Sequence, residues 1–300
     1  MHSDELDIDV GLVRGLLGGQ CPRWADLPLE RVRSAGTDNA IYRLGRAMAV
    51  RLPRRARTAL TLEKEREWLP RLAPHLPLAV PAPLFNGAPA ADSPWVWSVY
   101  RWLDGEDATN EGITDLREAA TRLARFVDAL QRIDATDGPP PGEHNFHRGV
   151  ALEARDAEVR SSLARLQDEI DASAVIAAWE AALGAPNWQA PAVWIHGDLD
   201  ARNLLVRHGS LTAVIDFGSV GVGDPACDVM VAWKVFSADT RTIFRAALSV
   251  DDATWARGRG WALSQAVAAL AYYTPETNPV LVGEARRWLA EVLADQAASL

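Results

Sequence analysis

The stretch Val193-Trp-Ile-His-Gly-Asp-Leu-Asp-Ala-Arg-Asn-Leu-Leu-Val206, followed by Leu211-Thr-Ala-Val-Ile-Asp-Phe-Gly218, decides the fold of this chain. Three short apolar runs within it, at 193–195, 204–206 and 211–215, predict three buried strands. The turn-forming sequence Arg-His-Gly-Ser separates the last two runs, so we expect them to form a β-hairpin.

Three polar residues, Asp198, Asn203 and Asp216, stand at the edges of these runs. Each is expected on a loop beside the hairpin, where a rigid scaffold usually presents reactive groups. Their spacing suits phosphoryl transfer, because Mg²⁺ prefers carboxylate and amide oxygens and a separate carboxylate must meet the attacking hydroxyl. We assign the hydroxyl-facing, catalytic role to Asp198 and the metal-binding roles to Asn203 and Asp216. Taken singly, the two aspartates are equally well explained as turn residues that cap strand ends.

The pattern His196-Gly-Asp-x-x-x-x-Asn203 with Ile215-Asp-Phe-Gly218 resembles the aminoglycoside phosphotransferase family, the kinase-like enzymes that include macrolide phosphotransferases and choline kinases. The resemblance implies an α+β fold with two lobes, like that of protein kinases. Residues 1–103 would form an N-terminal lobe, with an antiparallel β-sheet and a helix that bind nucleotide. Residues 104–300 would form a larger, mostly helical C-terminal lobe with the catalytic loop and the substrate-binding region.

Residues 29–53 are expected to form three strands, and in the resembled family the first turn of this meander covers the nucleotide phosphates. Ser34, Gly36 and Asn39 are therefore candidate phosphate-binding residues. The turn at 34–39 holds one glycine, so an ordinary hairpin turn is the alternative interpretation.

Arg51 lies in the third of these strands, where the resembled family usually has a lysine that holds the α- and β-phosphates. Relatives of the macrolide type also carry Arg-Leu-Pro here, which favours the macrolide-phosphotransferase-like branch. The alternative is an arginine that faces solvent. The ion-pair partner that the resemblance implies is Glu65 on the following helix, and Glu63 and Glu67 are expected to face solvent.

Residues 95–103 alternate like a strand and correspond to the hinge of the resembled family. A nucleotide base would bind the hinge backbone at Val99, Tyr100, Arg101 and Trp102. The choice between ATP and GTP stays open because it depends on backbone geometry. The tryptophans of this segment are equally well explained as packing residues.

Hydrophobic periodicity predicts further helices at 7–19, 115–133, 151–184, 229–236, 239–248, 252–273 and 279–298. Pro70 is expected to kink or end the helix that carries Glu65. By resemblance, Asp228 supports the catalytic loop. His196 stands at a strand end and is expected to fix that loop by hydrogen bonds, and a general base is the alternative interpretation. His144 and His147 are interpreted as surface residues.

The composition, 48% hydrophobic and 24% charged, is that of a globular protein. Its net charge of −9 argues against a nucleic-acid partner. Cys21 and Cys227 form no Cys-x-x-Cys motif, and no signal peptide or membrane-spanning run is evident. We therefore expect a cytoplasmic protein, monomeric or homodimeric, without a membrane partner.

The predicted function is transfer of the γ-phosphate of ATP or GTP to a hydroxyl of a small molecule, with Mg²⁺ as cofactor. Aminoglycoside and macrolide antibiotics are the acceptors that the resemblance suggests, which would make the protein an antibiotic-resistance enzyme. Two alternatives stay open: a metabolite kinase of the choline, homoserine or sugar type, and a kinase-like protein that binds nucleotide or ligand with weak turnover. The intact Asp198, Asn203 and Asp216 argue against the second alternative, and Arg51 argues for it.

Overall fold

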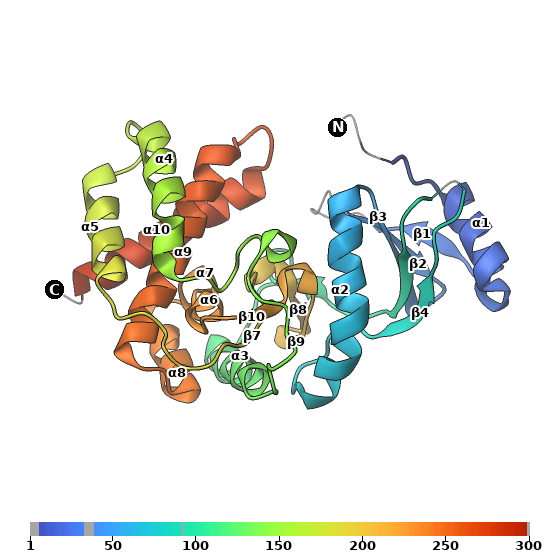
Figure 1. Ribbon diagram of the computed structural model, residues 1–300, viewed down its shortest axis with the longest axis horizontal. Helices are drawn as coiled ribbons and strands as arrows, with labels where there is room; N and C mark the ends of the chain where they lie inside the picture. Colours follow the sequence, from blue (N-terminus) through green and yellow to red (C-terminus); the bar gives the residue numbers. More distant parts are fainter. Residues whose placement is uncertain (1–5, 33–38, 92, 299–300) are drawn as a thin grey trace.

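The structure is a computed structural model that describes residues 6–32, 39–91 and 93–298. Its N-terminal part is a five-stranded sheet with helices against both faces, and its C-terminal part is mostly helical (Figure 1). The predicted α+β architecture with two unequal parts is confirmed. The large sheet has the order β1-β2-β3-β5-β4 with antiparallel neighbours, and its strands are β1 (Leu29–Arg31), β2 (Asn39–Leu44), β3 (Met48–Pro53), β4 (Pro83–Gly87) and β5 (Trp97–Arg101).

Side chains alternate between the two faces of this sheet, as the period of a strand requires. Val50 and Val99 are fully buried in a cluster with helix α1 (Val10–Gln20). Their neighbours Arg51 and Tyr100 point to the other face, toward helix α2 (Ala56–Leu72). The interpretation of Arg51 as a solvent-facing residue is therefore wrong.

The N-terminal helices differ from the prediction at their ends. Helix α1, predicted at 7–19, begins at Val10 and ends at Gln20, and α2 continues through Pro70 to Leu72. The turn around Pro70 persists because Leu69 and Leu72 are buried in the core, so tertiary packing outweighs the loss of one backbone hydrogen bond.

Two small sheets hold the predicted hairpin and the loops beside it. Strands β6 (Glu106–Asp107), β8 (Leu204–Arg207) and β9 (Ser210–Val214) form one antiparallel sheet, and β7 (Val193–Ile195) pairs with β10 (Gly221–Gly223) in the other. The two-residue turn between β8 and β9 places His208 and Gly209 in the left-handed region, at φ +53° and +75°. Two successive positive φ angles are typical of a tight hairpin turn.

The C-terminal helices are α3 (Leu116–Gln131), α4 (Asp156–Leu166), α5 (Ala172–Leu183), α6 (Ala226–Val229), α7 (Val231–Val235), α8 (Ala238–Leu248), α9 (Asp252–Tyr272) and α10 (Pro279–Ala298). Helices α4, α5, α6 and α10 all pack against α9. Gly258 and Gly260 of α9 permit the close approach of α6 and α5, since a Cβ atom would lie 2.6 Å from Val229 Cγ1 and 2.8 Å from Ala182 Cβ, respectively.

Three predicted elements differ in extent from those of the structure. The helix expected at 151–184 is divided into α4 and α5, the helix at 229–236 corresponds to α6 and α7, and the strand at 95–103 is the shorter β5. The break between α4 and α5 falls on the polar residues at 167–169, and Asp171 caps α5 by accepting a hydrogen bond from the N–H of Ala174.

The larger core cluster joins the two parts of the chain. It contains Leu62, Trp68 and Leu69 of α2 together with residues of the C-terminal helices. Ala79 also pairs with Ala213 of β9 in an isolated parallel bridge. The division at residues 103 and 104 stays a prediction, since this segment of the N-terminal part packs into the C-terminal core. Within the described ranges, no helix is long and apolar enough to cross a membrane.

Candidate active site

The loop after β7 is held in place by the buried carboxylate of Asp228. Its Oδ2 accepts a hydrogen bond from the backbone N–H of His196 at 2.7 Å, and its Oδ1 accepts one from the N–H of Gly197 at 2.8 Å. Gly197 has a φ of +83°, and a Cβ atom there would lie 2.6 Å from the carbonyl oxygen of Ser219. Glycine is therefore needed at this position. Asp228 lies where the resemblance placed it, beneath the loop.

His196 ties the same loop to the end of β9. Its Nδ1 accepts a hydrogen bond from the N–H of Asp198 at 3.2 Å, so the ring hydrogen is on Nε2, which donates to the carbonyl of Ile215 at 3.0 Å. The ring is fully buried and lies edge-on against Phe217. His196 thus has the structural position that the sequence predicted.

Asn203 is in direct contact with Asp198. Its Nδ2 donates to the backbone carbonyl of Asp198 at 2.8 Å and to Oδ2 of the Asp198 side chain at 3.3 Å. With the amide nitrogen engaged in this way, the amide oxygen is the atom that remains for a metal ion.

Asp216 has a backbone conformation that is uncommon for aspartate, with φ +62° and ψ +71°. A non-glycine residue in the left-handed region costs about 1–3 kcal/mol and is enriched at functional sites. Its side chain is 54% exposed and accepts a hydrogen bond from the N–H of Gly218. Asp216 therefore presents its carboxylate to the open space that Asp198 also borders.

Arg51 faces Asp216 and is engaged by three side chains. Its Nη1 lies 2.6 Å from Glu65 Oε2, and its Nη2 lies 3.5 Å from Asp216 Oδ1. With the Asn39 amide oriented so that its oxygen faces the guanidinium, that oxygen accepts from Nη2 at 3.0 Å and from Nε at 3.1 Å. Burial alone would lower the pKa of Arg51, but Glu65 and Asp216 raise it above its ordinary value. The pairing of Arg51 with Glu65, while Glu63 and Glu67 are exposed, agrees with the prediction.

A pocket of about 310 Å³ brings these groups together. It is lined by Asn39, Arg51, Arg55, Arg57, Thr58, Thr61, Phe146, Asp198, Asp216, Gly218 and Ser219. The sequence analysis identified Asn39, Arg51, Asp198 and Asp216 of this set and missed the rest. The basic run Arg54-Arg-Ala-Arg57 directly after β3 is the signal that could have indicated the arginines. Ser34 and Gly36 lie outside the described residues.

The predicted base-binding segment belongs to β5 and the residue after it. Val99 and Tyr100 are buried, and the N–H groups of Arg101 and Trp102 already donate to the carbonyls of Ala82 and Ala47. A base could therefore use the Trp102 carbonyl and the backbone that follows, and the base-binding assignment stays a prediction. Tyr100 has a second contact, because its hydroxyl lies 3.5 Å from Glu65 Oε2.

Two cations near Asp198 were not predicted. Arg148 Nη2 lies 3.9 Å from Asp198 Oδ1, and the buried Lys234 Nζ lies 4.0 Å from the same oxygen. Lys234 also lies 3.2 Å from the buried carboxylate of Asp200, which Arg202 contacts as well. Burial alone would raise the pKa of Asp200, but Lys234 and Arg202 hold it below its ordinary value. The contacts of Arg148 and Lys234 join residues far apart in the sequence, so no local pattern could show them.

His144, predicted to be a surface residue, is partly exposed but also makes contacts that the sequence did not indicate. His144 is half-buried, and its Nδ1 and backbone carbonyl both lie 3.0 Å from Lys64 Nζ of α2. A lysine ammonium only donates, so Nδ1 accepts from Lys64, and the ring hydrogen is on Nε2, which donates to the carbonyl of Pro140 at 2.8 Å. The contact joins α2 to the segment between α3 and α4. His147 is exposed, as expected.

We expect Lys64→Met to change how stability depends on pH. Burial lowers the pKa of Lys64 to about 8 from its ordinary value of 10.5, against the opposing effect of Glu65. At pH values between these two pKa values, Lys64 is protonated in the unfolded chain but not in the folded chain. Lys64 therefore makes the free energy of unfolding rise with pH, by up to about 1.4 kcal/mol per pH unit. Urea denaturation from pH 7 to 10 should show that wild type gains stability relative to the variant. Parallel curves would contradict the shift.

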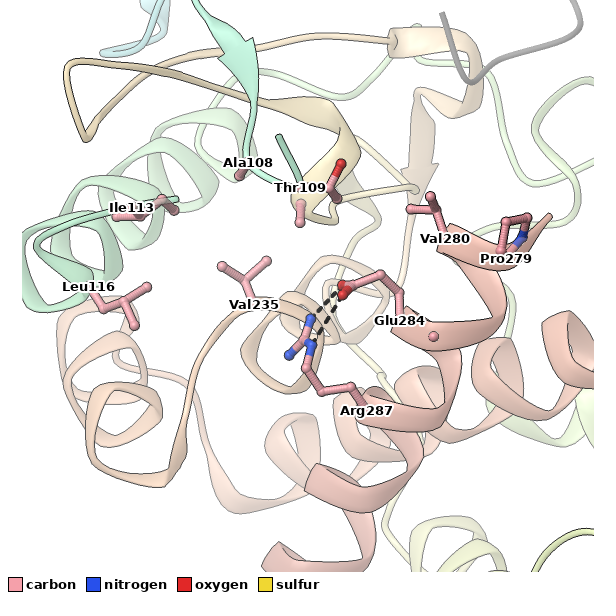
Figure 2. Close-up of a pocket in the computed structure, with 11 residues that line it drawn as sticks. Ala108, Thr109, Ile113, Leu116, Val235, Pro279, Val280, Glu284 and Arg287 are labelled. Carbon is pink, nitrogen blue, oxygen red and sulfur yellow. Dashed lines mark hydrogen bonds and ion pairs between the residues drawn. The ribbon is translucent and has the colours of Figure 1, made fainter. Parts of the chain in front are cut away.

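A second pocket, of about 580 Å³, lies beside the catalytic loop (Figure 2). It is lined by Ala108, Thr109, Ile113, Leu116, Ala201, Val235, Pro279, Val280, Gly283, Glu284 and Arg287. Glu284 and Arg287 point toward each other and form an ion pair at 2.7 Å. Ala201 follows Asp198 by three residues and Val235 follows Lys234, so the pocket borders the surroundings of Asp198. No sequence pattern indicated it, because its walls come from four separate segments.

Asn203 and Asp216 fit a magnesium ion by the chemistry of their donor atoms. An amide oxygen and an exposed carboxylate are hard oxygen ligands, and Mg²⁺ is usually bound by one or two protein groups together with substrate phosphates. In the described part of the chain, no cluster of three or more His, Cys, Asp or Glu residues forms a metal cage. A metal ion here would therefore depend on the phosphates for its other ligands.

Fold and site together define a kinase-like phosphotransferase. Similar solved structures include the GDP and kanamycin complex of APH(2")-IIia, 19% identical, with a TM-score of 0.71 over 94% of this chain and 98% of that chain. ADP-bound APH(2'')-Ib is 17% identical, with a TM-score of 0.59 over 95% and 99%. The apoenzyme of macrolide 2'-phosphotransferase MphH from Brachybacterium faecium is 25% identical, with a TM-score of 0.60 over 90% and 97%. Comparison with curated protein sequences gives no match.

The model of the phosphotransferase enzyme family matches residues 30–261 of this chain. The chain belongs to this family, and the kinase-like fold that the sequence predicted is confirmed.

Proposed function

We propose that this protein transfers the terminal phosphate of ATP or GTP to a hydroxyl group of a small molecule. The observation that supports this most is that Asp198, Asp216 and Arg51 line one pocket, with Asn203 bonded to Asp198 and Glu65 bonded to Arg51. Solved structures of similar fold are named as complexes with GDP, ADP or ATP. Both the geometry of the pocket and the comparisons therefore support a nucleotide as the phosphate donor.

In the proposed reaction, the acceptor oxygen forms a bond to the terminal phosphorus while the bond from phosphorus to the bridging oxygen breaks. The nucleoside diphosphate leaves, and the hydroxyl proton passes to a carboxylate oxygen of Asp198. Arg148 and Lys234, both on the Oδ1 side, orient that carboxylate. Asn203 and Asp216 would hold Mg²⁺, which offsets phosphate charge when bound. Positioning and charge stabilisation supply most of the rate gain, because a loose transition state needs little covalent help from the protein.

We place the acceptor in the pocket beside Ala201 (Figure 2). Its lining is mostly apolar, and its carboxylate, Glu284, is already paired with Arg287. A polycationic aminoglycoside needs unpaired carboxylates, so this lining favours an acceptor with apolar surface and uncharged hydroxyls, such as a macrolide. A macrolide 2'-phosphotransferase is among the structures of similar fold. Binding without turnover, the alternative that Arg51 raised, loses its support because Arg51 makes the expected pair with Glu65.

The test is a thermal-shift measurement with ATP or GTP and Mg²⁺, followed by phosphate transfer to a panel of macrolides, aminoglycosides and small alcohols. A nucleotide at about 100 times its dissociation constant should stabilise the native protein by roughly 2.7 kcal/mol. Transfer to a macrolide is the expected outcome. Transfer to an aminoglycoside instead would overturn the acceptor assignment, and the absence of any nucleotide effect would overturn the proposed function.

A further inference from the structure

Arg57 lies in the first turn of α2, in the N-terminal part of the chain. It lines the same pocket as Asp198 and Asp216, which belong to the C-terminal part. Its guanidinium lies 4.3 Å from the centre of the Phe146 ring. Its Nη2 also donates to the carbonyl of Glu143 at a long 3.4 Å. Among the described residues, it forms no ion pair with a carboxylate. Arg57 is therefore a cation at the pocket wall whose charge nothing in the described chain neutralises.

Phe146 is held in a costly conformation beneath this arginine. It has a φ of +56°, the next residue His147 has a φ of +55°, and the Phe146 side chain is 40% exposed. A bulky aromatic residue in the left-handed region is uncommon and persists where the surroundings enforce it. The fully buried Asn145 does so, since its amide accepts from the N–H of Gly142 and donates to the carbonyl of Arg148. The loop thus holds an exposed ring against Arg57 at a cost that core packing does not explain.

The loop from Gly142 to Arg148 also indicates which end of the pocket Arg57 serves. Arg148, two residues after Phe146, approaches the carboxylate of Asp198 at 3.9 Å. Arg51 lies against Asp216, and Glu65, Asp216 and Asn39 already engage its guanidinium. Arg57 is thus linked to Asp198 through the loop that carries Phe146 and Arg148, whereas Arg51 is in direct contact with Asp216.

We propose that Arg57, held against the ring of Phe146, binds the terminal phosphate of the nucleotide, which is the group to be transferred. This inference rests on the proposed function. A guanidinium presents a planar set of donors that matches two oxygens of a phosphate group. The ring fixes the plane of the guanidinium and reduces the freedom that the side chain loses on binding. In the transition state Arg57 would offset charge on the oxygens of the moving phosphoryl group.

The experiment compares binding of a non-hydrolysable triphosphate analogue with binding of the matching diphosphate, by calorimetry with Mg²⁺. Arg57→Ala should lower the affinity for the triphosphate analogue by about tenfold or more and leave the affinity for the diphosphate nearly unchanged. Only the triphosphate carries the phosphate group that Arg57 would contact. Arg57→Lys should lose part of the effect, since it keeps the charge and lacks the planar fork. Phe146→Ala should show a smaller loss with the same selectivity, and Phe146→Trp should keep wild-type affinity.

Arg71→Ala is the matched control, because Arg71 is another arginine of α2 that stacks on an aromatic ring, Trp68, outside the pocket. It should change neither affinity. If wild type binds both nucleotides, two results would overturn this inference alone. Arg57→Ala could lose affinity equally for the triphosphate analogue and the diphosphate, or it could lose affinity for neither. A wild-type protein that binds neither nucleotide would overturn the proposed function and this inference with it. Melting temperatures without nucleotide show whether each variant is folded.

Discussion

Asp198→Asn is expected to lower the rate of phosphate transfer by about 100- to 10,000-fold, the usual range for loss of a general base. Asparagine has nearly the same shape as aspartate, and its side-chain oxygen can still accept the hydrogen bond from Asn203 Nδ2. The loop should therefore keep its geometry, while the hydroxyl proton loses its acceptor. Single-turnover kinetics with the acceptor found by the panel would measure the chemical step directly.

The control for this variant is nucleotide affinity, which should change little because the proposed phosphate contacts of Arg51 and Arg57 remain. Asp168→Asn, an exposed carboxylate between α4 and α5, should leave both rate and affinity unchanged. A transfer rate in Asp198→Asn within about threefold of wild type, far below the usual contribution of a general base, would remove Asp198 from the catalytic role.

Arg257→Met is expected to destabilise the folded protein by about 3–5 kcal/mol, because it leaves a buried carboxylate without its charge partner. Arg257 of α9 is 2% exposed and Asp224 is 5% exposed, and their side chains meet at 2.7 and 3.1 Å. Asp224 also accepts from the N–H of Ala226 at the start of α6, which leads to Asp228 beneath the catalytic loop. The free energy of unfolding in urea measures the loss.

Arg286→Ala gives the contrast for this prediction, since Arg286 is 62% exposed and its pairing with Glu169, at 3.8 Å, is screened by water. It should change stability little. The double variant Asp224→Asn with Arg257→Met should recover part of the lost stability, because it removes the unpaired charge. If Arg257→Met is as stable as Arg286→Ala, the buried pair does not hold α6 and α9 together.

Much of the fold was predictable from local sequence, and particular residues show why. The runs at 193–195 and 204–206 gave β7 and β8 because short apolar segments beside turn residues have few alternatives to buried strands. The choice of Glu65 among three glutamates is confirmed by its contact with Arg51. The continuation of α2 through Pro70 was not predictable, because the burial of Leu69 and Leu72 that sustains it comes from elements elsewhere in the chain.

The sequence by itself determined the family, the hairpin and the order of the polar residues along the catalytic loop. These depend on the type and spacing of neighbouring residues, which a linear pattern contains. Only the tertiary structure decided that Lys64 contacts His144, that Arg148 and Lys234 approach Asp198, and that Arg57 stacks on Phe146. Each of these contacts joins segments separated by dozens of residues. Such pairings depend on how the helices and loops pack around a shared core, so no local pattern records them.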